Sequence, residues 1–320
     1  MSRPTDRSTG RVESTNANHL TGTHETHIKG ADSSPERSVH VSSSAERVGR
    51  IALGRLRTML SERDLAIVAS VDQYRYLSGG QINRLHFHSH ASEFTAARTA
   101  RSVLNRLVAG RLLRRTERRI GGIRGGSSSY VYGIGPVGHR LMHDDGSRGR
   151  WDEPSTTFLD HTLAIAELAI DITEAARTER AAEESPLEIQ TEPRCWRTFT
   201  KGLGGREILK PDLLLSLVSG EYEDRWFTEM DLATESITAI QKKCHTYIDY
   251  HRSGIEQHQH DVFPRVLWVV PTSKRARQIQ EVVDRLRAPA GLFSVSVSHH
   301  VVNAVIGIGD GQDNSVRGSS

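Results

Sequence analysis

Three acidic side chains stand in two apolar segments that have the character of neighbouring β-strands. Asp212 precedes the apolar run 213–217, and Glu229 and Asp231 lie two residues apart just after Trp226. Residues i and i+2 of a strand share a face, and an antiparallel partner strand would bring Asp212 opposite them. Converging carboxylates repel one another unless a cation binds them, and oxygen-only ligands suit Mg²⁺ or Mn²⁺. Such a metal could activate a water molecule and stabilise charge on a phosphodiester.

The segments around these acids resemble the PD-(D/E)XK nuclease superfamily over about residues 158–270. The resemblance rests on KPDLLLSL, on RWFTEMD, on a preceding helix that carries Glu167, and on the following helix ITAIQKKCHTYIDY. It implies a restriction-endonuclease-like α/β sandwich with a mixed sheet. It also implies that Asp212, Glu229 and Glu167 bind Mg²⁺ or Mn²⁺ if the domain is active.

One residue departs from the superfamily pattern. Asp231 occupies the position where the pattern has a lysine that orients the attacking water. Lys243, or its neighbour Lys242, could reach the site from the next helix, where Lys243 and Tyr247 share a face. The predicted catalytic residues are therefore Asp212, Glu229, Asp231 and Lys243. The alternative is that these lysines form a solvated helix face and that the domain is an inactive scaffold, since fold does not guarantee activity.

A second set of residues suited to chemistry is a run of arginines. Residues 98–124 contain nine arginines and a single acid, Glu117, and residues 61–150 carry 15 Lys and Arg against seven acids. Cations on a recognition helix and on a wing would bind DNA phosphates. The predicted DNA-binding residues are Arg98, Arg101, Arg106, Arg114, Arg118, Arg119 and Arg124. A solvated basic face is the alternative.

The pattern of apolar residues around these arginines predicts three helices followed by a hairpin. A helix covers about Leu65–Tyr76, Ser78 caps a short second helix, and Ser92-Glu93 opens a third that ends at Gly110. The apolar side of the third helix comprises Phe94, Ala97, Val103, Leu104 and Leu107. Two short strands around a Gly/Ser tip then complete the order of a winged helix-turn-helix.

The rest of the chain alternates helix and strand. Helices are predicted at 158–177, 237–250 and 274–286, and strands at 187–192, 208–217, 226–232, 266–270, 293–297 and 301–306. The expected organisation is a disordered tail over 1–48, a winged-helix DNA-binding domain over 50–145, a nuclease-like domain over 155–306 and a disordered tail over 307–320. A winged helix followed by a nuclease-like region is similar to the replication-relaxation family of bacterial plasmids and mobile elements.

Two other motifs invite functional hypotheses. His86-Phe87-His88 matches the metal motif of rolling-circle nickases, but it falls in a loop between predicted helices, where histidines near phosphates are commoner. The glycines 133, 135 and 138 match GxGxxG, but no long crossover helix follows, so a strand leading into a short Pro-started helix is the better interpretation. His161 is predicted to be a core residue, and His258 and His260 to lie in a polar loop.

Composition excludes several classes of protein. The chain has no run of 18 apolar residues and no apolar signal-peptide core, so neither membrane insertion nor secretion is expected. Two cysteines make neither a disulfide framework nor a cysteine-based zinc site. The hypothesis is a cytoplasmic protein of a plasmid or mobile element that binds double-stranded DNA, with replication or conjugation proteins as further partners and a homodimer as an allowed state. The alternative is a winged-helix transcriptional regulator with a C-terminal ligand or dimerisation domain.

Overall fold

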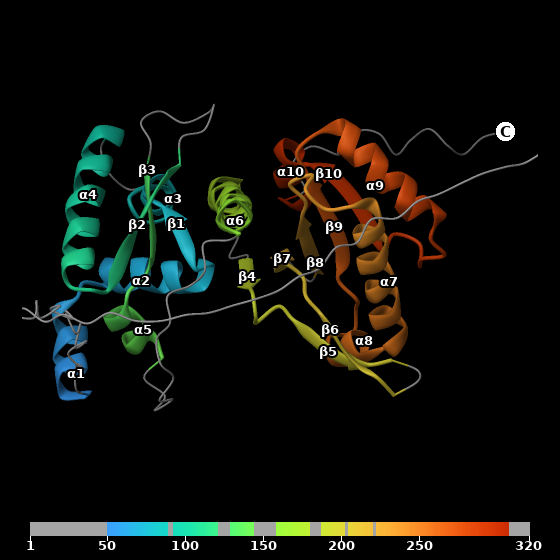
Figure 1. Cartoon of the computed structure of the whole chain (residues 1–320), viewed down its shortest axis with the longest axis horizontal. Coiled ribbons are helices and arrows are strands. Elements are labelled where there is room, and N and C mark those ends of the chain that lie inside the picture. The colour runs from blue at the N-terminus through green and yellow to red at the C-terminus, as the bar shows by residue number, and fades with distance from the viewer. Residues whose placement is uncertain are drawn as a thin grey trace, which may run out of the picture. The chain divides into compact units, whose positions relative to one another are not determined.

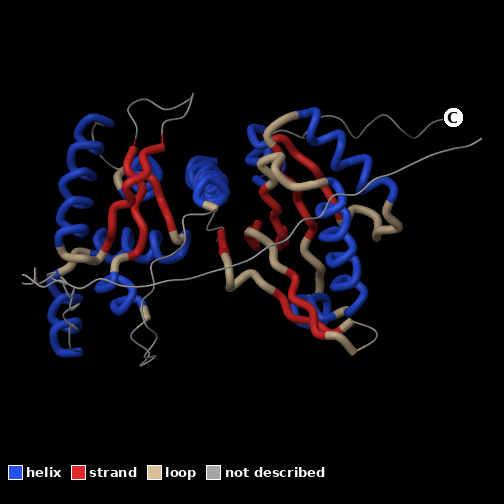
Figure 2. Tube along the Cα trace, in the orientation of Figure 1, coloured by secondary structure: helices blue, strands red, loops and turns tan. Residues whose placement is uncertain are grey.

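The computed structural model describes residues 50–88, 92–120, 129–143, 158–179, 187–201, 204–219 and 222–306 (Figure 1). The two predicted tails, most of the Gly/Ser tip, Arg124 and His90 lie outside these residues. The described part has a mixed α/β architecture with a three-stranded sheet, a mixed five-stranded sheet and a separate two-stranded ribbon (Figure 2).

The first half of the described chain is mostly helical. Its elements are α1 (Arg50–Met59), α2 (Glu62–Tyr74), β1 (Tyr76–Ser78), α3 (Gly79–His86), α4 (Glu93–Ala109), β2 (Leu113–Ile120), β3 (Ser129–Ile134) and α5 (Pro136–Met142). Ser61 and Ser78 each form a capping box, in which the serine hydroxyl and the side chain three residues later satisfy each other's backbone N–H groups. These two serines therefore fix where α2 and α3 begin.

The strands β1, β3 and β2 form an antiparallel sheet in that order, with β3 in the middle. β3 then leads into α5 through Gly135 and Gly138, where the chain passes very close to the backbone of residues 111–112. A Cβ atom at Gly135 would lie 2.3 Å from the Arg111 carbonyl oxygen, and one at Gly138 would lie 2.1 Å from that of Leu112. Close backbone packing therefore accounts for these two glycines of the GxGxxG match, and the short Pro-started helix is confirmed.

The second half of the described chain builds the five-stranded sheet. Its elements are α6 (Leu159–Glu179), β4 (Leu187–Thr191), β5 (Arg197–Thr200), β6 (Arg206–Leu209), β7 (Leu213–Ser219), β8 (Tyr222–Met230), α7 (Ile237–Ser253), α8 (Ile255–His260), β9 (Arg265–Val270), α9 (Ser273–Arg285), β10 (Phe293–Val297) and α10 (Val301–Ile306). The strand order is β10-β9-β8-β7-β4, and β5 and β6 pair separately. β7 pairs antiparallel with β4 on one side and with β8 on the other, whereas β8, β9 and β10 are parallel to one another. The predicted mixed sheet is therefore confirmed.

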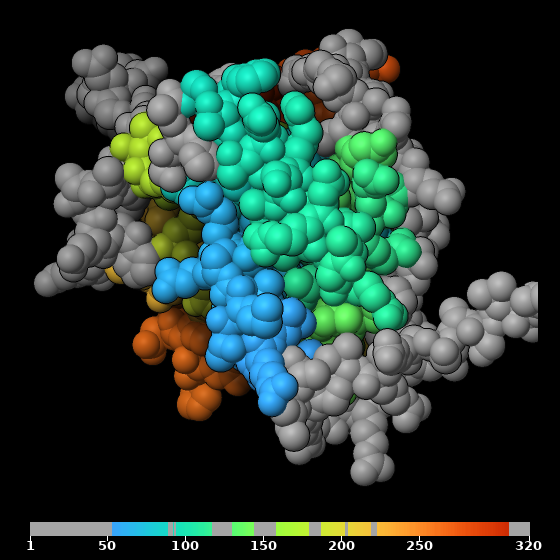
Figure 3. Space-filling model, turned by 90° about the vertical axis from the view of Figure 1, so that its left-hand side faces the viewer, coloured from blue at the N-terminus to red at the C-terminus, as the bar shows by residue number. Residues whose placement is uncertain are grey.

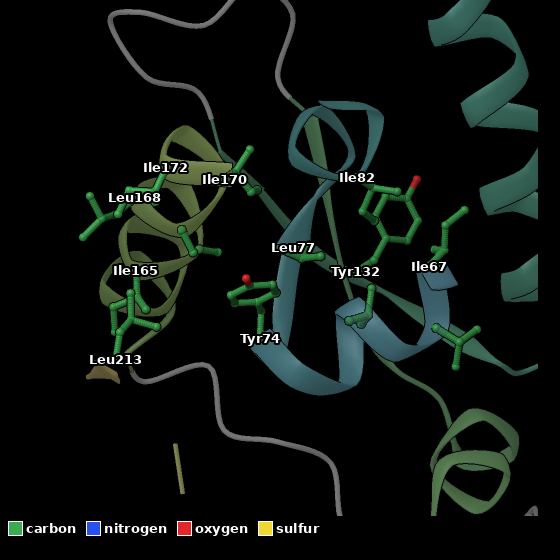
Figure 4. Close-up of a cluster of buried hydrophobic side chains, with 14 of the residues drawn as sticks. Ile67, Tyr74, Leu77, Ile82, Tyr132, Ile165, Leu168, Ile170, Ile172 and Leu213 are labelled. Carbon is green, nitrogen blue, oxygen red and sulfur yellow. The ribbon is translucent and has the colours of Figure 1, made fainter. Parts of the chain in front are cut away.

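Alternation along the strands divides the sheet's side chains between two helical layers. Leu213 and Leu215 of β7 pack in one apolar cluster with α6 and α10, whereas Leu214 packs in another with α7 and α9. Figure 4 shows α6 directing apolar side chains toward β1 and toward Leu213. α6 contacts β1 and α3 as well as β4 and β8, so one continuous apolar cluster runs through both halves.

Several predicted elements need correction. The apolar segment 301–306 is the helix α10, not a strand, because Val301, Val305 and Ile306 bury one helical face beside α6. The segment 208–217 is broken at Pro211-Asp212 into β6 and β7. The helix predicted to reach Tyr76 ends at Tyr74, because Tyr76 begins β1. The strand β5 and the helices α1 and α8 were not predicted, and His258 and His260 belong to α8, not to a loop. Phe94 was assigned to the apolar side of its helix and is 77% exposed, because the buried stripe of α4 runs through Ala96, Ala100, Leu104 and Leu107.

Candidate functional site

Glu229 lies in the middle of the five-stranded sheet and is completely buried. It belongs to β8, whose alternation points it toward the helix α7. Lys243 and Tyr247 of that helix, one turn apart, donate hydrogen bonds to its two carboxylate oxygens. Burial raises the pKa of Glu229, and the charge of Lys243 opposes that rise. The structure therefore brings Lys243 to Glu229.

Asp212 sits beside Glu229, at the start of β7. The Met230 N–H donates to its Oδ2 atom at 2.7 Å, and His161 Nε2 lies 3.2 Å from its Oδ1 atom. The hydrogen bond to Asp212 raises the pKa of His161, which means that the imidazole gains a proton more readily than a free histidine. His161 was predicted to be a core residue, yet its side chain is 31% exposed and belongs to this polar cluster.

The other two predicted acids bind arginines. Asp231 accepts hydrogen bonds from Nε and Nη2 of Arg275 in α9, at 2.6 and 3.3 Å. Glu167 accepts from Arg84 Nη1 at 2.6 Å and from Gln81 Nε2 at 2.9 Å, both on α3. Glu167 follows His161 by six residues, which places it about 240° around α6 and away from Asp212.

These contacts decide how the predicted acids fit a divalent cation. Each of Glu229, Asp231 and Glu167 is paired with a protein cation, and Asp212 is bonded to a backbone N–H and an imidazole. Within the described ranges, no group of three or more His, Cys, Asp or Glu residues is arranged to hold a metal ion. The donor set that Mg²⁺ or Mn²⁺ needs is therefore not assembled by these residues as they stand.

A cavity of about 360 Å³ opens beside Asp212 and His161. Its wall includes Tyr74 and Arg75 from the end of α2, and Glu192 from the segment after β4. The Arg75 guanidinium lies 3.4 Å from the Glu192 carboxylate across this wall. The cavity therefore gives the Asp212–His161 pair access to solvent, whereas Glu229 has none.

Sequence reasoning missed Arg275 and misjudged His161. Arg275 occupies a position on the buried stripe of α9, four residues before Ile279 and seven before Val282. A cation on an otherwise apolar stripe indicates that a buried acid pairs with it, because charged side chains are rarely buried without a partner. No comparable signal marks His161, because its partner Asp212 is 51 residues away in the sequence.

The second candidate site is the outer face of α4. Thr95, Arg98, Arg101, Ser102 and Asn105 are all exposed and follow one another at helical spacing. In the described part of the chain, no ion pair joins Arg98 or Arg101 to a carboxylate. Figure 3 views this side of the molecule, and α4 (teal) covers much of it. We call these five residues the α4 face.

The remaining predicted arginines have different surroundings. Arg106 turns back from the α4 face to Asp64, with its Nη2 atom 2.8 Å from Oδ1 of that buried carboxylate. Arg114 is half-buried on β2. Arg118 and Arg119 belong to the same strand, where Arg119 is in register with Tyr130, and Arg124 lies outside the described residues.

The two histidines of the His-Phe-His motif have different surroundings. His86 closes α3 and its Nε2 atom lies 3.0 Å from Ser70 Oγ, Phe87 is buried, and His88 is exposed. Burial, together with the nearby His88, Arg63 and Arg177, lowers the pKa of His86 to about 4. His86 is thus a neutral, packed residue at physiological pH.

The family model described as replication-relaxation matches residues 68–266. The chain belongs to the replication-relaxation family. The match begins within α2 and ends at the start of β9, so it includes both the α4 face and the cluster around Glu229. No curated protein matches the chain. Among the described helices of this family member, none is both long and apolar enough to cross a bilayer.

Proposed function

We propose that this replication-relaxation protein binds double-stranded DNA and acts in the replication, relaxation or transfer of a plasmid or mobile element. The elements α2, β1, α3, α4, β2 and β3 would form a winged helix-turn-helix, with α4 as the recognition helix. Two features support this assignment: the helix–strand–helix–helix–strand–strand order, and the antiparallel sheet order β1-β3-β2.

The observation that carries the proposal is the α4 face. Among the described residues, no carboxylate pairs with Arg98 or Arg101, whereas Arg84 and Arg275 are bound to carboxylates. Thr95, Ser102 and Asn105 supply hydroxyl and amide groups between them. Free guanidinium groups bind phosphates and guanine edges, and small polar side chains bind base edges or the backbone. This combination is what a helix needs in order to dock in a major groove.

The hairpin extends the same chemistry. Arg114, Arg118 and Arg119 belong to β2, and Arg115 stacks its guanidinium 4.2 Å from the centre of the Tyr130 ring. A wing that lies along the DNA backbone needs cations in this place. Arg106 is assigned differently, because its contact with Asp64 ties it to the start of α2.

We propose that the second half is a degenerate nuclease-like domain. An α-helix, antiparallel strands that carry Asp212 and Glu229, a further helix with Lys243 and then a parallel strand support the resemblance to PD-(D/E)XK nucleases. The fit of its acids to a divalent cation is poor, as described above. The domain would therefore serve as a platform for DNA or for replication or conjugation proteins, in a monomer or a homodimer.

Duplex binding by full-length protein tests the proposal. Fluorescence anisotropy with a labelled duplex is measured over a range of salt concentrations for the parent and for Arg98→Ala/Arg101→Ala. We expect weaker binding, and a slope of log K against log salt that is shallower by about two. Lys274→Ala/Arg277→Ala, two exposed cations of α9, removes the same charge and should change little. Equal binding by the parent and the α4 variant would overturn the proposal.

Two further assays separate the alternatives. A metal-dependent nuclease would nick supercoiled plasmid in Mg²⁺ or Mn²⁺ and lose that activity in Asp212→Ala and Glu229→Ala. A transcriptional regulator would be found only at promoters when its binding sites are mapped in the cell, with none at an origin of replication or transfer.

A further inference from the structure

The ammonium group of Lys243 has unusual surroundings. It donates to Oε2 of Glu229, a carboxylate with no solvent exposure, and it lies 5.9 Å from the centre of the Trp268 ring. Its side chain is 26% exposed, so most of it is enclosed by the protein.

Two buried carboxylates on adjacent strands need such a cation. Glu229 is 0% exposed and Asp212 is 6% exposed, and the charge of Asp212 opposes ionisation of Glu229. Removing a carboxylate from water is expensive unless an opposite charge and hydrogen bonds compensate it. Lys243 provides the charge, while Tyr247 and the Met230 N–H provide hydrogen bonds.

In an oxygen-ligand metal site the same compensation comes from a divalent ion. Here only Asp212 and Glu229 remain as ligands, with water molecules for the rest of the shell, because the other two acids are committed elsewhere. Asp231 is bonded through both oxygens to Arg275, and Glu167 points from α6 to Arg84. The place for a cation beside Glu229 is taken by a side chain of the protein itself.

We propose that Lys243 is a built-in cation that takes the place of a divalent metal beside Glu229, and that the intact protein does not bind Mg²⁺ or Mn²⁺ there. The proposal does not depend on DNA binding, because it concerns only the charge balance of the sheet. It predicts that removal of Lys243 creates a metal site: Glu229 would then lack a counter-charge, which Mn²⁺ or Mg²⁺ bound by Glu229 and Asp212 could supply.

The test compares thermal unfolding of the full-length protein in EDTA and in MnCl₂ or MgCl₂. The parent should unfold at the same midpoint in all three. Lys243→Ala should unfold about 10 °C lower in EDTA, and millimolar Mn²⁺ should recover much of that loss. Lys242→Ala is the matched control, because this neighbour is exposed. It should behave as the parent does.

Direct binding of Mn²⁺ completes the test, with the amount of free Mn²⁺ measured by electron paramagnetic resonance. The parent should show no saturable site, and Lys243→Ala should show one per chain that is lost in Lys243→Ala/Glu229→Gln. A saturable site in the parent that Glu229→Gln abolishes would overturn the proposal, and this measurement decides it even if Lys243→Ala does not fold. A folded Lys243→Ala that ignores Mn²⁺ would also overturn it.

Discussion

The α4 face and the cluster around Glu229 differ in whether their charged side chains are exposed and whether they are paired. Arg98 and Arg101 are exposed and have no carboxylate partner among the described residues, whereas Glu229 and Asp231 are buried and each holds a protein cation. A charge that is already neutralised inside the protein has little left to offer a ligand, and an unpaired exposed charge has all of its interaction energy available. The proposed binding therefore uses the free charges of the helix, whereas the paired charges of the sheet contribute to stability.

The largest effect that would sharpen this comparison concerns Arg275. Arg275→Ala leaves Asp231, which is 1% exposed, without its charge partner. We expect the free energy of unfolding in urea to fall by about 3–5 kcal/mol, while duplex affinity of the folded protein stays unchanged. Arg277→Ala, an exposed neighbour on α9, is the control. A loss below about 1 kcal/mol would show that the pair contributes little.

Two arginines of a single helix provide the intermediate case. Arg106→Ala should lower stability by about 1 kcal/mol, a modest value because its side chain is 55% exposed even though Asp64 is 3% exposed. Arg98→Ala should leave stability unchanged and weaken duplex binding. Urea denaturation gives the stability of each variant, and fluorescence anisotropy gives its affinity for the duplex. Equal losses of affinity in the two variants would break the distinction between the structural and the binding arginine.

The last prediction concerns a pH dependence at the end of α3, which is small near neutral pH and grows only in acid. The pKa of His86 is about 4 in the folded protein and about 6.5 in the unfolded chain. Between about pH 6.5 and 4, His86 is therefore protonated in the unfolded chain but not in the folded protein. The free energy of unfolding falls as the pH falls through that range. His86→Gln should flatten the plot of unfolding free energy against pH over that window. An unchanged slope would contradict the assignment of His86 as a half-buried, neutral residue.

Local signals predicted much of this structure. Ser78 and Ser92 were correctly placed before their helices, because capping depends on residues only three apart. The mixed sheet followed from short apolar runs separated by helical segments. The segment 301–306 failed because its valines favour a strand in isolation, and only packing against α6 makes it helical.

The partners of the candidate residues could not be predicted in the same way. The i, i+4 spacing anticipated that Lys243 and Tyr247 share a face, and both reach Glu229. The pairing of Arg275 with Asp231 spans 44 residues and that of Arg84 with Glu167 spans 83. Such pairings depend on how helices dock, which no local pattern encodes.

The position of α6 limits which segments of the gene could be exchanged by recombination. Leu163 of α6 packs with Tyr76 and Val131 of the small sheet, and Ile165 belongs to the apolar cluster that includes Leu213 of the large one. A gene segment that ended before α6 would encode a small sheet with Tyr76 and Val131 open to water. We therefore expect recombination among relatives to exchange residues 50–306 as a single piece, with new binding preferences arising by substitution on α4.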